Sequence, residues 1–417
     1  MHMSILLTIE KFFFPFYQSK NIKKIFTILN SNSEKTQAMF VGGCVRKYLL
    51  NQKIGDIDVA TILTPDEVIK KFENSNVEVK KTGIDHGTLT LVLEKQHIEI
   101  TTLRKDIATD GRHANVSFTD SWEEDSKRRD FTINAIYLDQ KGKIFDPQSG
   151  VSDLNNKKVK FIGNSDERIK EDYLRILRFI RFSIEYSNFD SDKETLRAIQ
   201  INLNGIAKLS KERIYDELSK ILKLKNFEGI YKSKTLFNIF KLVFPEFKYI
   251  DRVIKFSTIR NLKEELLQRD TILASLLVDG SNNHEYFSHK YNTSNETKDY
   301  LDFCSRNLKE AGKDKDFFKK HLKKNIFYNG KNKMKSLFLI YSITKQNFNY
   351  KELTSMLSKI DSIFIPKFPV TGNYLLNKGI KNGKKIGLLL KQIEKKWIDN
   401  NFSLDDKELN ILLKKNI

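Results

Sequence analysis

The sequence predicts an α+β protein, with a mixed α/β head over residues 1–155 and helical segments over residues 156–228, 229–345 and 346–417. Three observations indicate this fold class. A strand, a glycine turn, a helix and a second strand follow one another between residues 38 and 60. Strand-like alternation returns between residues 77 and 103, and after residue 165 only helical spacing is left. A chain of 417 residues, 40% of them hydrophobic, is long enough to form several cores.

The composition favours a polyanionic partner. The formal net charge is +20, with Lys and Arg spread along the chain, which is typical of proteins that bind nucleic acid. A Lys-rich surface that reflects biased genome composition is the alternative. The two cysteines, Cys44 and Cys304, allow no disulfide framework and no cysteine-based zinc site, and they fit a reducing compartment.

The N-terminal run ILLTIEKFFFPF is apolar but is interrupted by Glu10, Lys11 and Pro15, so we expect it to pack on the head rather than to act as a signal peptide. No other segment reaches membrane-spanning length. We therefore expect a cytoplasmic protein.

The first elements of the head contain residues that are suited to bind a nucleotide. A helix is expected over residues 19–31, followed by a strand over 38–41, a turn at Gly42-Gly43 and a helix that contains Arg46. Glycines lack a Cβ and let successive backbone N–H groups approach a triphosphate closely. Arg46, one turn into the helix, adds a phosphate donor.

Two acids follow on the next strand. Asp56 and Asp58 lie two residues apart and so project to the same face of a strand. Neighbouring carboxylates repel each other unless a hard divalent cation lies between them, and Mg²⁺ is the cation that we expect. A DxD pattern alone is a weak indication of a metal site, but with GGxxR at this spacing it is a strong one.

The segment VGGCVRKYLLNQKIGDIDVA (residues 41–60) resembles the DNA polymerase β-like nucleotidyltransferase superfamily. Further motifs narrow the resemblance to the tRNA nucleotidyltransferases (CCA-adding enzymes) of the family that also contains bacterial poly(A) polymerases. The resemblance covers residues 38–224 well and the rest only as helices. It implies a polymerase β-like catalytic head, a helical neck with a base-reading helix, a helical body and a basic tail. In one departure, Lys47 stands where relatives usually have an acid.

A third acid is expected on a later strand. A capping box at Thr64-Pro65-Asp66-Glu67 predicts a helix over 65–72, and strands follow over 77–80, 88–93 and 97–103. Alternation on the last strand separates Glu99 from the apolar face. The resemblance implies that Glu99 joins Asp56 and Asp58 as a catalytic metal ligand, whereas a solvent-facing glutamate is the alternative.

Residues 103–118 (LRKDIATDGRHANVSF) are polar and contain glycine, which predicts a mobile loop. The resemblance implies the flexible loop between the first two catalytic motifs. Family members that add only the two cytidines have a shortened loop, so its retention, with Arg112 in place, favours full CCA addition. A salt bridge within the loop is the alternative role for Arg112.

Residues 127–136 (KRRDFTINAI) predict an apolar-alternating strand after two arginines. Guanidinium groups suit phosphate oxygens, so Arg129 and Arg128 are expected at the triphosphate. The resemblance associates Asp130 and Asn134 with ribose recognition, although either could instead hold the backbone of the site. It also implies that residues 146–154 form a hinge.

A single helix is expected to carry Asp172 and Arg175, three residues and about 60° apart, so that both address one ligand edge. A carboxylate with a guanidinium complements the amino group and ring acceptor of cytosine and of adenine. Uracil and guanine would mismatch at a cost of about 1–3 kcal/mol. The resemblance identifies this pair in its EDxxR motif. Of the following arginines, Arg178 can reach phosphate, and Arg181 serves the RNA or a structural pair.

The resemblance implies a CCA tRNA nucleotidyltransferase. Such an enzyme adds CMP, CMP and AMP from CTP and ATP to the tRNA 3′ end without a nucleic-acid template, and it releases pyrophosphate by a two-metal mechanism with Mg²⁺. Lysines beside glycines in the tail suit the tRNA acceptor stem and elbow. No protein partner or membrane is implied.

Three alternatives stay open. Poly(A) polymerases of the family usually carry a Gly-Arg-Arg-Phe run where this chain has EITTLR (residues 99–104), which favours CCA addition. An enzyme that adds only A or only CC is the second alternative. The third, from another class, is a catalytically silent RNA-binding protein, against which the DxD and EDxxR patterns argue.

Overall fold

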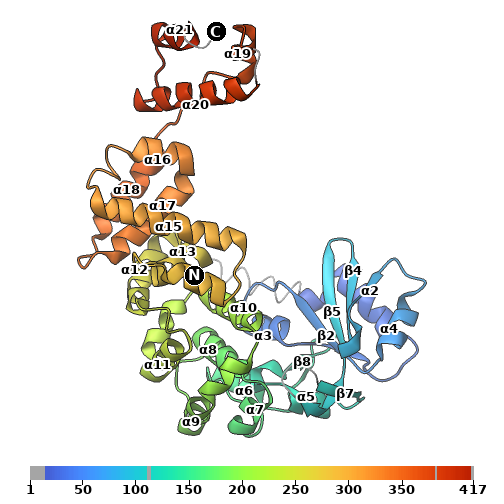
Figure 1. The fold of residues 1–417 in the computed structure, drawn as a ribbon. Coiled ribbons are helices and arrows are strands. Elements are labelled where there is room, and N and C mark those ends of the chain that lie inside the picture. The colour runs from blue at the N-terminus through green and yellow to red at the C-terminus, as the bar shows by residue number, and fades with distance from the viewer. Residues whose placement is uncertain (1–14, 110–113, 381–382, 415–417) are drawn as a thin grey trace. The chain divides into compact units, whose positions relative to one another are not determined.

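The computed structural model describes residues 15–109, 114–380 and 383–414, and the chain divides after Pro245 into two compact units (Figure 1). The first unit combines strands and helices, and the second is helical in its described residues. The α+β fold class is therefore confirmed. The finer division at residues 155, 228 and 345 stays a prediction. None of the helices in the described ranges is long and apolar enough to cross a membrane.

The head occupies the first part of the first unit. Its elements are η1 (Phe16–Gln18), α2 (Lys20–Leu29), β1 (Ala38–Val41), α3 (Gly43–Leu49), β2 (Ile57–Thr61), α4 (Pro65–Phe72), β3 (Glu78–Gly83), η2 (Ile84–His86), β4 (Thr88–Leu93), β5 (Gln96–Thr102), β6 (Arg104–Thr109), β7 (Ala114–Phe118), α5 (Trp122–Arg128), η3 (Thr132–Asn134), β8 (Tyr137–Leu138), β9 (Ile144–Phe145) and α6 (Gly150–Asn155).

Helices complete the first unit. They are α7 (Ser165–Glu171), α8 (Leu174–Tyr186), α9 (Lys193–Asn202), η4 (Leu203–Lys208), α10 (Lys211–Leu222), η5 (Phe227–Lys232) and α11 (Lys234–Val243).

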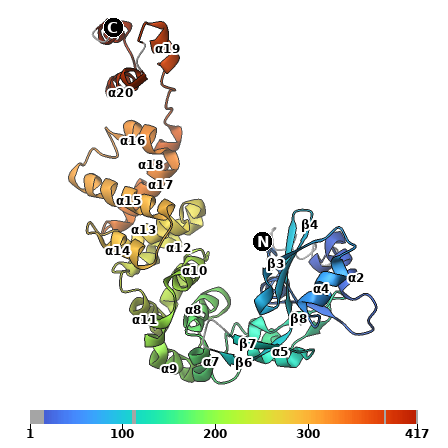
Figure 2. The ribbon, with the colours of Figure 1, turned by 45° about the vertical axis from the view of Figure 1, so that its right-hand side comes forward.

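A seven-stranded sheet in the order β3-β4-β5-β2-β1-β8-β9 forms the centre of the head. All neighbouring strands are antiparallel except β2 and β5, whose parallel register pairs Asp58 with Glu99. Every residue of β1 is buried, and β5 alternates as expected, with Ile98 and Ile100 inside and Glu99 outside. Helices α2 and α4 lie side by side next to the sheet (Figure 2). The sheet thus places Asp58 of β2 beside Glu99 of β5, and Asp56 directly precedes β2.

The expected loop of residues 103–118 is instead largely a hairpin, in which β6 and β7 pair antiparallel. Its polar composition concealed the strands, because strand patterns are recognised by their buried face. At its base, Phe118 packs so closely on Gly87 that a Cβ there would lie 2.8 Å from the ring. Gly87 also has φ +77°, which favours glycine. Arg112 lies outside the described residues, as does the N-terminal run of residues 1–14.

Two more expectations are wrong. The strand expected over 131–136 is a short 3₁₀ turn, η3, followed by the two-residue strand β8. The expected single helix is broken between α7 and α8, because Asp172 is extended at φ −156° and ψ 105°. Asp172 Oδ1 then accepts a hydrogen bond from the N–H of Leu174 at 3.2 Å, at the start of α8. Because of this break, Asp172 does not follow the helical spacing that would place it about 60° from Arg175.

Helices make up the described part of the second unit. They are η6 (Ile250–Val253), α12 (Ile254–Lys263), η7 (Glu264–Leu266), α13 (Arg269–Leu277), α14 (Asn283–Lys290), α15 (Asn295–Lys313), α16 (Leu322–Asn329), α17 (Lys331–Thr344), α18 (Tyr350–Ser362), α19 (Gly372–Asn377), α20 (Gly383–Asp399) and α21 (Asp406–Lys414).

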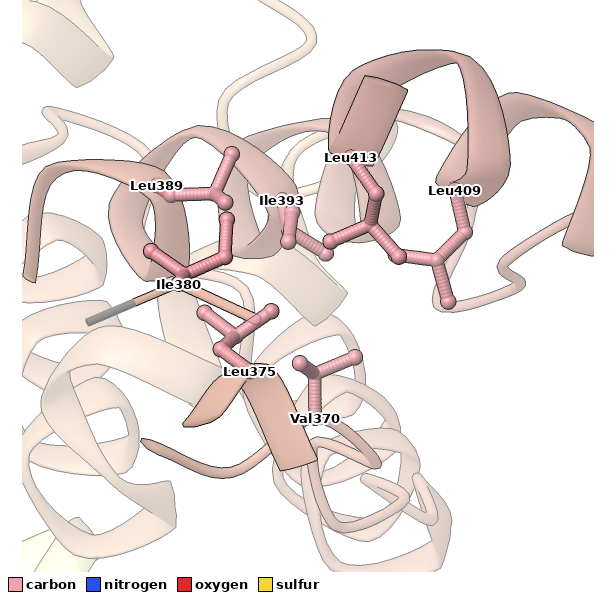
Figure 3. Packing of buried hydrophobic residues seen from close by; sticks show 7 residues of the cluster. All are labelled: Val370, Leu375, Ile380, Leu389, Ile393, Leu409 and Leu413. Carbon is pink, nitrogen blue, oxygen red and sulfur yellow. The ribbon is translucent and has the colours of Figure 1, made fainter. Parts of the chain in front are cut away.

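The C-terminal helices of the second unit share a small core. Figure 3 shows side chains of α19, α20 and α21 and of the segments beside α19 turned toward one another. The residues of this core are Val370, Leu375, Ile380, Leu389, Ile393, Leu409 and Leu413. The lysine-rich tail is therefore a packed helical piece and not merely a charged extension.

Candidate functional site

A cleft of about 660 Å³ in the first unit gathers nearly all of the predicted site residues. Every one of them lines it except Glu99 and the undescribed Arg112. The cleft also contains residues that the sequence analysis did not assign to the nucleotide site, namely Leu174, Phe182, Arg213 and Lys220. The full lining is Gly42, Gly43, Arg46, Asp56, Asp58, Arg128, Arg129, Asp130, Asn134, Asp172, Leu174, Arg175, Arg178, Arg181, Phe182, Arg213 and Lys220.

The acids lie where the sheet meets the glycine turn. Asp58 is on β2, and Asp56 directly precedes that strand. Gly42 has φ +73°, and a Cβ on it would lie 3.6 Å from Asp58 Oδ2. A glycine is therefore needed for the backbone conformation, and the turn runs close past the carboxylate.

The carboxyl of Asp58 is in an unfavourable place for a negative charge. Burial raises its pKa, and the nearby carboxylates of Glu99 and Asp56 raise it further, while Arg129 lowers it. Such a conflict is relieved by a bound cation. In the described residues, the one group of three possible ligands within 4.8 Å of one another is elsewhere, at His284, Glu285 and Asp302. Glu99 is exposed and does not line the cleft.

Arg46 is the cleft arginine without a carboxylate partner in the part of the chain that the structure describes. Its side chain is buried, its guanidinium lies 5.1 Å from the ring centre of Phe182 and 5.2 Å from that of Tyr186, and it donates to Asn134 Oδ1. Its Nε is buried without a hydrogen-bond partner among the same residues. A fixed, unpaired cation at a glycine turn is suited to an anion.

The other arginines of the cleft are each held by a carboxylate. The pairs are Arg128 and Arg129 with Asp125, Arg175 with Glu171, Arg178 with Asp130, Arg181 with Glu217, and Arg213 with Asp172. One carboxylate cannot occupy all five N–H donors of a guanidinium, so these ion pairs do not by themselves prevent the arginines from binding a ligand. For Arg181 the structural pair that we expected as one possibility is present.

Asp130 organises the middle of the site. It accepts hydrogen bonds from Asn134 Nδ2 at 2.6 Å and from Arg178 Nε at 2.6 Å. Although burial disfavours its charged form, Arg178 and the Asn134 amide lower the pKa of Asp130 to about 2. Asp130 is therefore ionised at neutral pH, and it holds Asn134, whose Oδ1 in turn accepts from Arg46.

The supposed pair of Asp172 and Arg175 is arranged differently from our expectation. Both line the cleft, but they lie on either side of the helix break and have separate partners. Asp172 Oδ2 lies 2.7 Å from Arg213 of α10, and Arg175 is held by Glu171 and by the carbonyl of Arg168. The sequence analysis did not single out Arg213, because its role depends on the packing of α10 against α8.

Three comparisons, with family models, with protein sequences and with solved structures, agree on the same family of proteins. The model of the family "Poly A polymerase head domain" matches residues 38–160, and that of "Probable RNA and SrmB- binding site of polymerase A" matches residues 188–250. The CCA tRNA nucleotidyltransferase 1, mitochondrial, of Mus musculus is 34% identical over 391 residues, which cover 92% of this chain and 87% of the relative.

A bacterial relative and a solved structure agree with this match. The CCA-adding enzyme of Ligilactobacillus salivarius is 30% identical over 93% of this chain and 95% of its own. The crystal structure of the Bacillus stearothermophilus CCA-adding enzyme in complex with CTP has a TM-score of 0.68 at 23% identity, over 94% of this chain and 96% of that one. This last likeness is one of fold.

Proposed function

The chain belongs to the family of CCA tRNA nucleotidyltransferases, and on that premise we propose that it adds CMP, CMP and AMP from CTP and ATP to the 3′ end of tRNA without a nucleic-acid template, releasing pyrophosphate. The observation that carries the proposal is that one cleft holds the acids Asp56 and Asp58, the arginines, and the candidate base readers Asp172 and Arg175. Transfer without a template requires that the groups that carry out the reaction and the groups that select the base lie in one place.

We assign a divalent cation, Mg²⁺, to Asp56 and Asp58, with Glu99 as the third ligand. The donor set fits, because carboxylate oxygens are the ligands that Mg²⁺ prefers and the raised pKa of Asp58 reports a charge conflict that a cation relieves. When bound, the metal would activate the tRNA 3′ hydroxyl and stabilise charge on the leaving pyrophosphate.

The remaining cleft residues bind and orient the nucleotide. Arg46, Arg128 and Arg129 are assigned to the triphosphate, together with the N–H groups of the glycine turn. Asp130 and Asn134 form the connected polar pair that we assign to the ribose. Asp172 and Arg175, each held by its own partner, present a carboxylate and a guanidinium to the base, and this combination complements cytosine and adenine.

The direct test uses a tRNA transcript that lacks its terminal CCA. Purified protein with Mg²⁺ is given CTP, ATP or both, and the 3′ ends are sequenced. We expect products that stop at CC with CTP alone and at CCA with both nucleotides. Long A tails with ATP alone would instead indicate a poly(A) polymerase, and no extension would indicate a silent RNA-binding protein.

Replacement of Arg46 should weaken nucleotide binding more than it weakens folding. Lysine cannot reproduce the planar group that lies against Phe182 and Tyr186 and donates to Asn134. For Arg46→Lys we expect a KM for CTP and ATP that is about tenfold higher, the effect of one lost charge-assisted hydrogen bond. Steady-state kinetics at fixed tRNA check this, and an unchanged KM would remove Arg46 from the phosphate site.

The tail is assigned to tRNA. Lysines beside Gly379, which follows α19, and beside Gly383 at the start of α20 give backbone and ammonium donors for the phosphates of the acceptor stem and elbow. The cytoplasmic location expected from the sequence stays a prediction, since the mouse and human relatives are named mitochondrial enzymes.

A further inference from the structure

One buried carboxylate lies behind the phosphate side of the cleft. Asp125, on α5, is fully buried, and the residues around it come from three places in the head. Its Oδ1 accepts from Arg128 Nε at 2.7 Å and from the backbone N–H of Arg104 at 3.4 Å. Its Oδ2 accepts from Arg129 Nε at 3.1 Å, Arg129 Nη2 at 3.0 Å and Tyr137 Oη at 2.7 Å.

These bonds leave Asp125 no capacity for a ligand. A carboxylate has about four lone-pair sites, and five donors already converge on this one. Asp125 does not line the cleft, whereas Arg128 and Arg129 do. Although burial disfavours its charge, the two arginines lower the pKa of Asp125 to about 2, so that it is ionised at any working pH. Asp125 can therefore affect a bound nucleotide only through Arg128 and Arg129.

The same carboxylate joins the arginines to the hairpin. Arg104 is the first residue of β6, and the other end of the hairpin, Phe118, packs on Gly87. On the opposite side, Arg168 of α7 donates to the carbonyls of Arg128 and Arg129 at 2.6 and 2.7 Å. The backbone of the arginine pair is thus held from α7, while Asp125 binds both guanidinium groups. That of Arg129 also donates to Tyr137 Oη at 3.1 Å and to the carbonyl of Asn134 at 3.4 Å.

We propose that Asp125 is a positioning residue that couples the placement of the β6–β7 hairpin to Arg128 and Arg129, and thereby sets the affinity of the cleft for nucleotide phosphates. The inference rests on the proposed function, because it assigns the two arginines to the triphosphate. A movement at the hairpin base displaces the Arg104 N–H, and the carboxylate that accepts from it carries the guanidinium groups along.

The test is a double-mutant cycle between Asp125→Asn on α5 and Phe118→Ala at the hairpin base. For each variant of the full chain, KM and kcat are measured for CTP and ATP at saturating tRNA. We expect Asp125→Asn to raise both KM values about tenfold or more, with kcat within about threefold of the unaltered protein. Phe118→Ala should raise KM less, and it should add nothing in the Asp125→Asn background.

Two further variants keep the result interpretable. Glu124→Gln alters the exposed neighbouring acid on α5, which pairs with Lys127 at 2.8 Å, and should leave KM unchanged. If Asp125→Asn does not fold, Tyr137→Phe replaces it in the cycle, since it removes the hydroxyl that donates to Oδ2 and accepts from Arg129 Nε, and it leaves both ion pairs. Unchanged KM values, or effects of the two substitutions that simply multiply, would overturn the coupling.

Nucleotide binding measured by calorimetry separates this inference from the proposed function. Absence of tRNA extension by the unaltered protein would overturn the function. A nucleotide affinity that falls in Asp125→Asn, falls in Phe118→Ala alone and falls no further in the double variant would still support the coupling. Affinity equal to that of the unaltered protein would overturn the coupling even in an active enzyme.

Discussion

Asp58→Asn is expected to abolish nucleotide transfer while raising the melting temperature of the protein in the presence of EDTA. Burial and the carboxylates of Glu99 and Asp56 raise the pKa of Asp58 in the folded chain. A carboxyl of this kind favours folding only at low pH, and that contribution is lost as the pH rises through its folded pKa. At a pH above this folded pKa the ionised Asp58 therefore destabilises the metal-free fold, and asparagine removes that charge.

Activity should respond in the opposite direction. Without this ligand, kcat is expected to fall on the order of 10³-fold, equivalent to about 4 kcal/mol of transition-state stabilisation. The measurements are primer extension with Mg²⁺ and thermal unfolding with and without Mg²⁺. Mg²⁺ should stabilise the unaltered protein and have little effect on the variant.

The control for Asp58→Asn is Asp85→Asn, which replaces an exposed carboxylate of η2 in the same head. It should leave both activity and melting temperature unchanged. A melting temperature of Asp58→Asn below that of the unaltered protein in EDTA would contradict the proposed charge conflict. Full activity of the variant would contradict its role as a metal ligand.

Gly205→Ala is expected to destabilise the first unit and to loosen the choice of base. Gly205, on η4, is buried, and a Cβ on it would lie 2.0 Å from the ring of Tyr173. Tyr173 stands at the break between α7 and α8, directly after Asp172. Alanine must therefore push this ring away, at a cost of about 1–3 kcal/mol in unfolding free energy. The displaced backbone carries Asp172 with it.

Two measurements follow for Gly205→Ala. Thermal unfolding should occur at a lower temperature, and incorporation of UMP or GMP relative to CMP and AMP should rise about tenfold, in line with the loss of one base-specific hydrogen bond. Gly312→Ala on α15 is the matched control, because a Cβ there meets no atom within 4 Å and alanine is the better helix former. Unaltered base choice in a destabilised Gly205→Ala would separate Tyr173 from the base reader.

Much of the head could be predicted from local sequence. The capping box at Thr64 and Glu67 forms as expected and starts α4 at Pro65, and β4 covers the expected residues. These elements depend on side chains that are close in sequence or on strict alternation. The cleft residues could be predicted from motifs, because a nucleotide site requires particular residue types. These are glycines at a turn, paired acids and arginines.

The rest depended on contacts between distant segments. Helical spacing continues through Asp172, and nothing local reveals that Tyr173 meets Gly205 and that Arg213 binds Asp172. The burial of Glu217, which holds Arg181, is likewise a result of helix packing. Asp125 did have a local signal, because Arg128 and Arg129 follow it at the i+3 and i+4 positions of a helix.

The pairing of arginines with carboxylates has a consequence for substrate exchange. Eight cationic side chains line the cleft, while four aspartates line it and three further carboxylates hold its arginines. The cleft is therefore close to electroneutral, although the whole chain carries +20. Ionic strength would screen the chain's long-range attraction for RNA far more than its hold on a nucleotide. The RNA can stay bound by diffuse charge while successive nucleotides enter and leave the cleft.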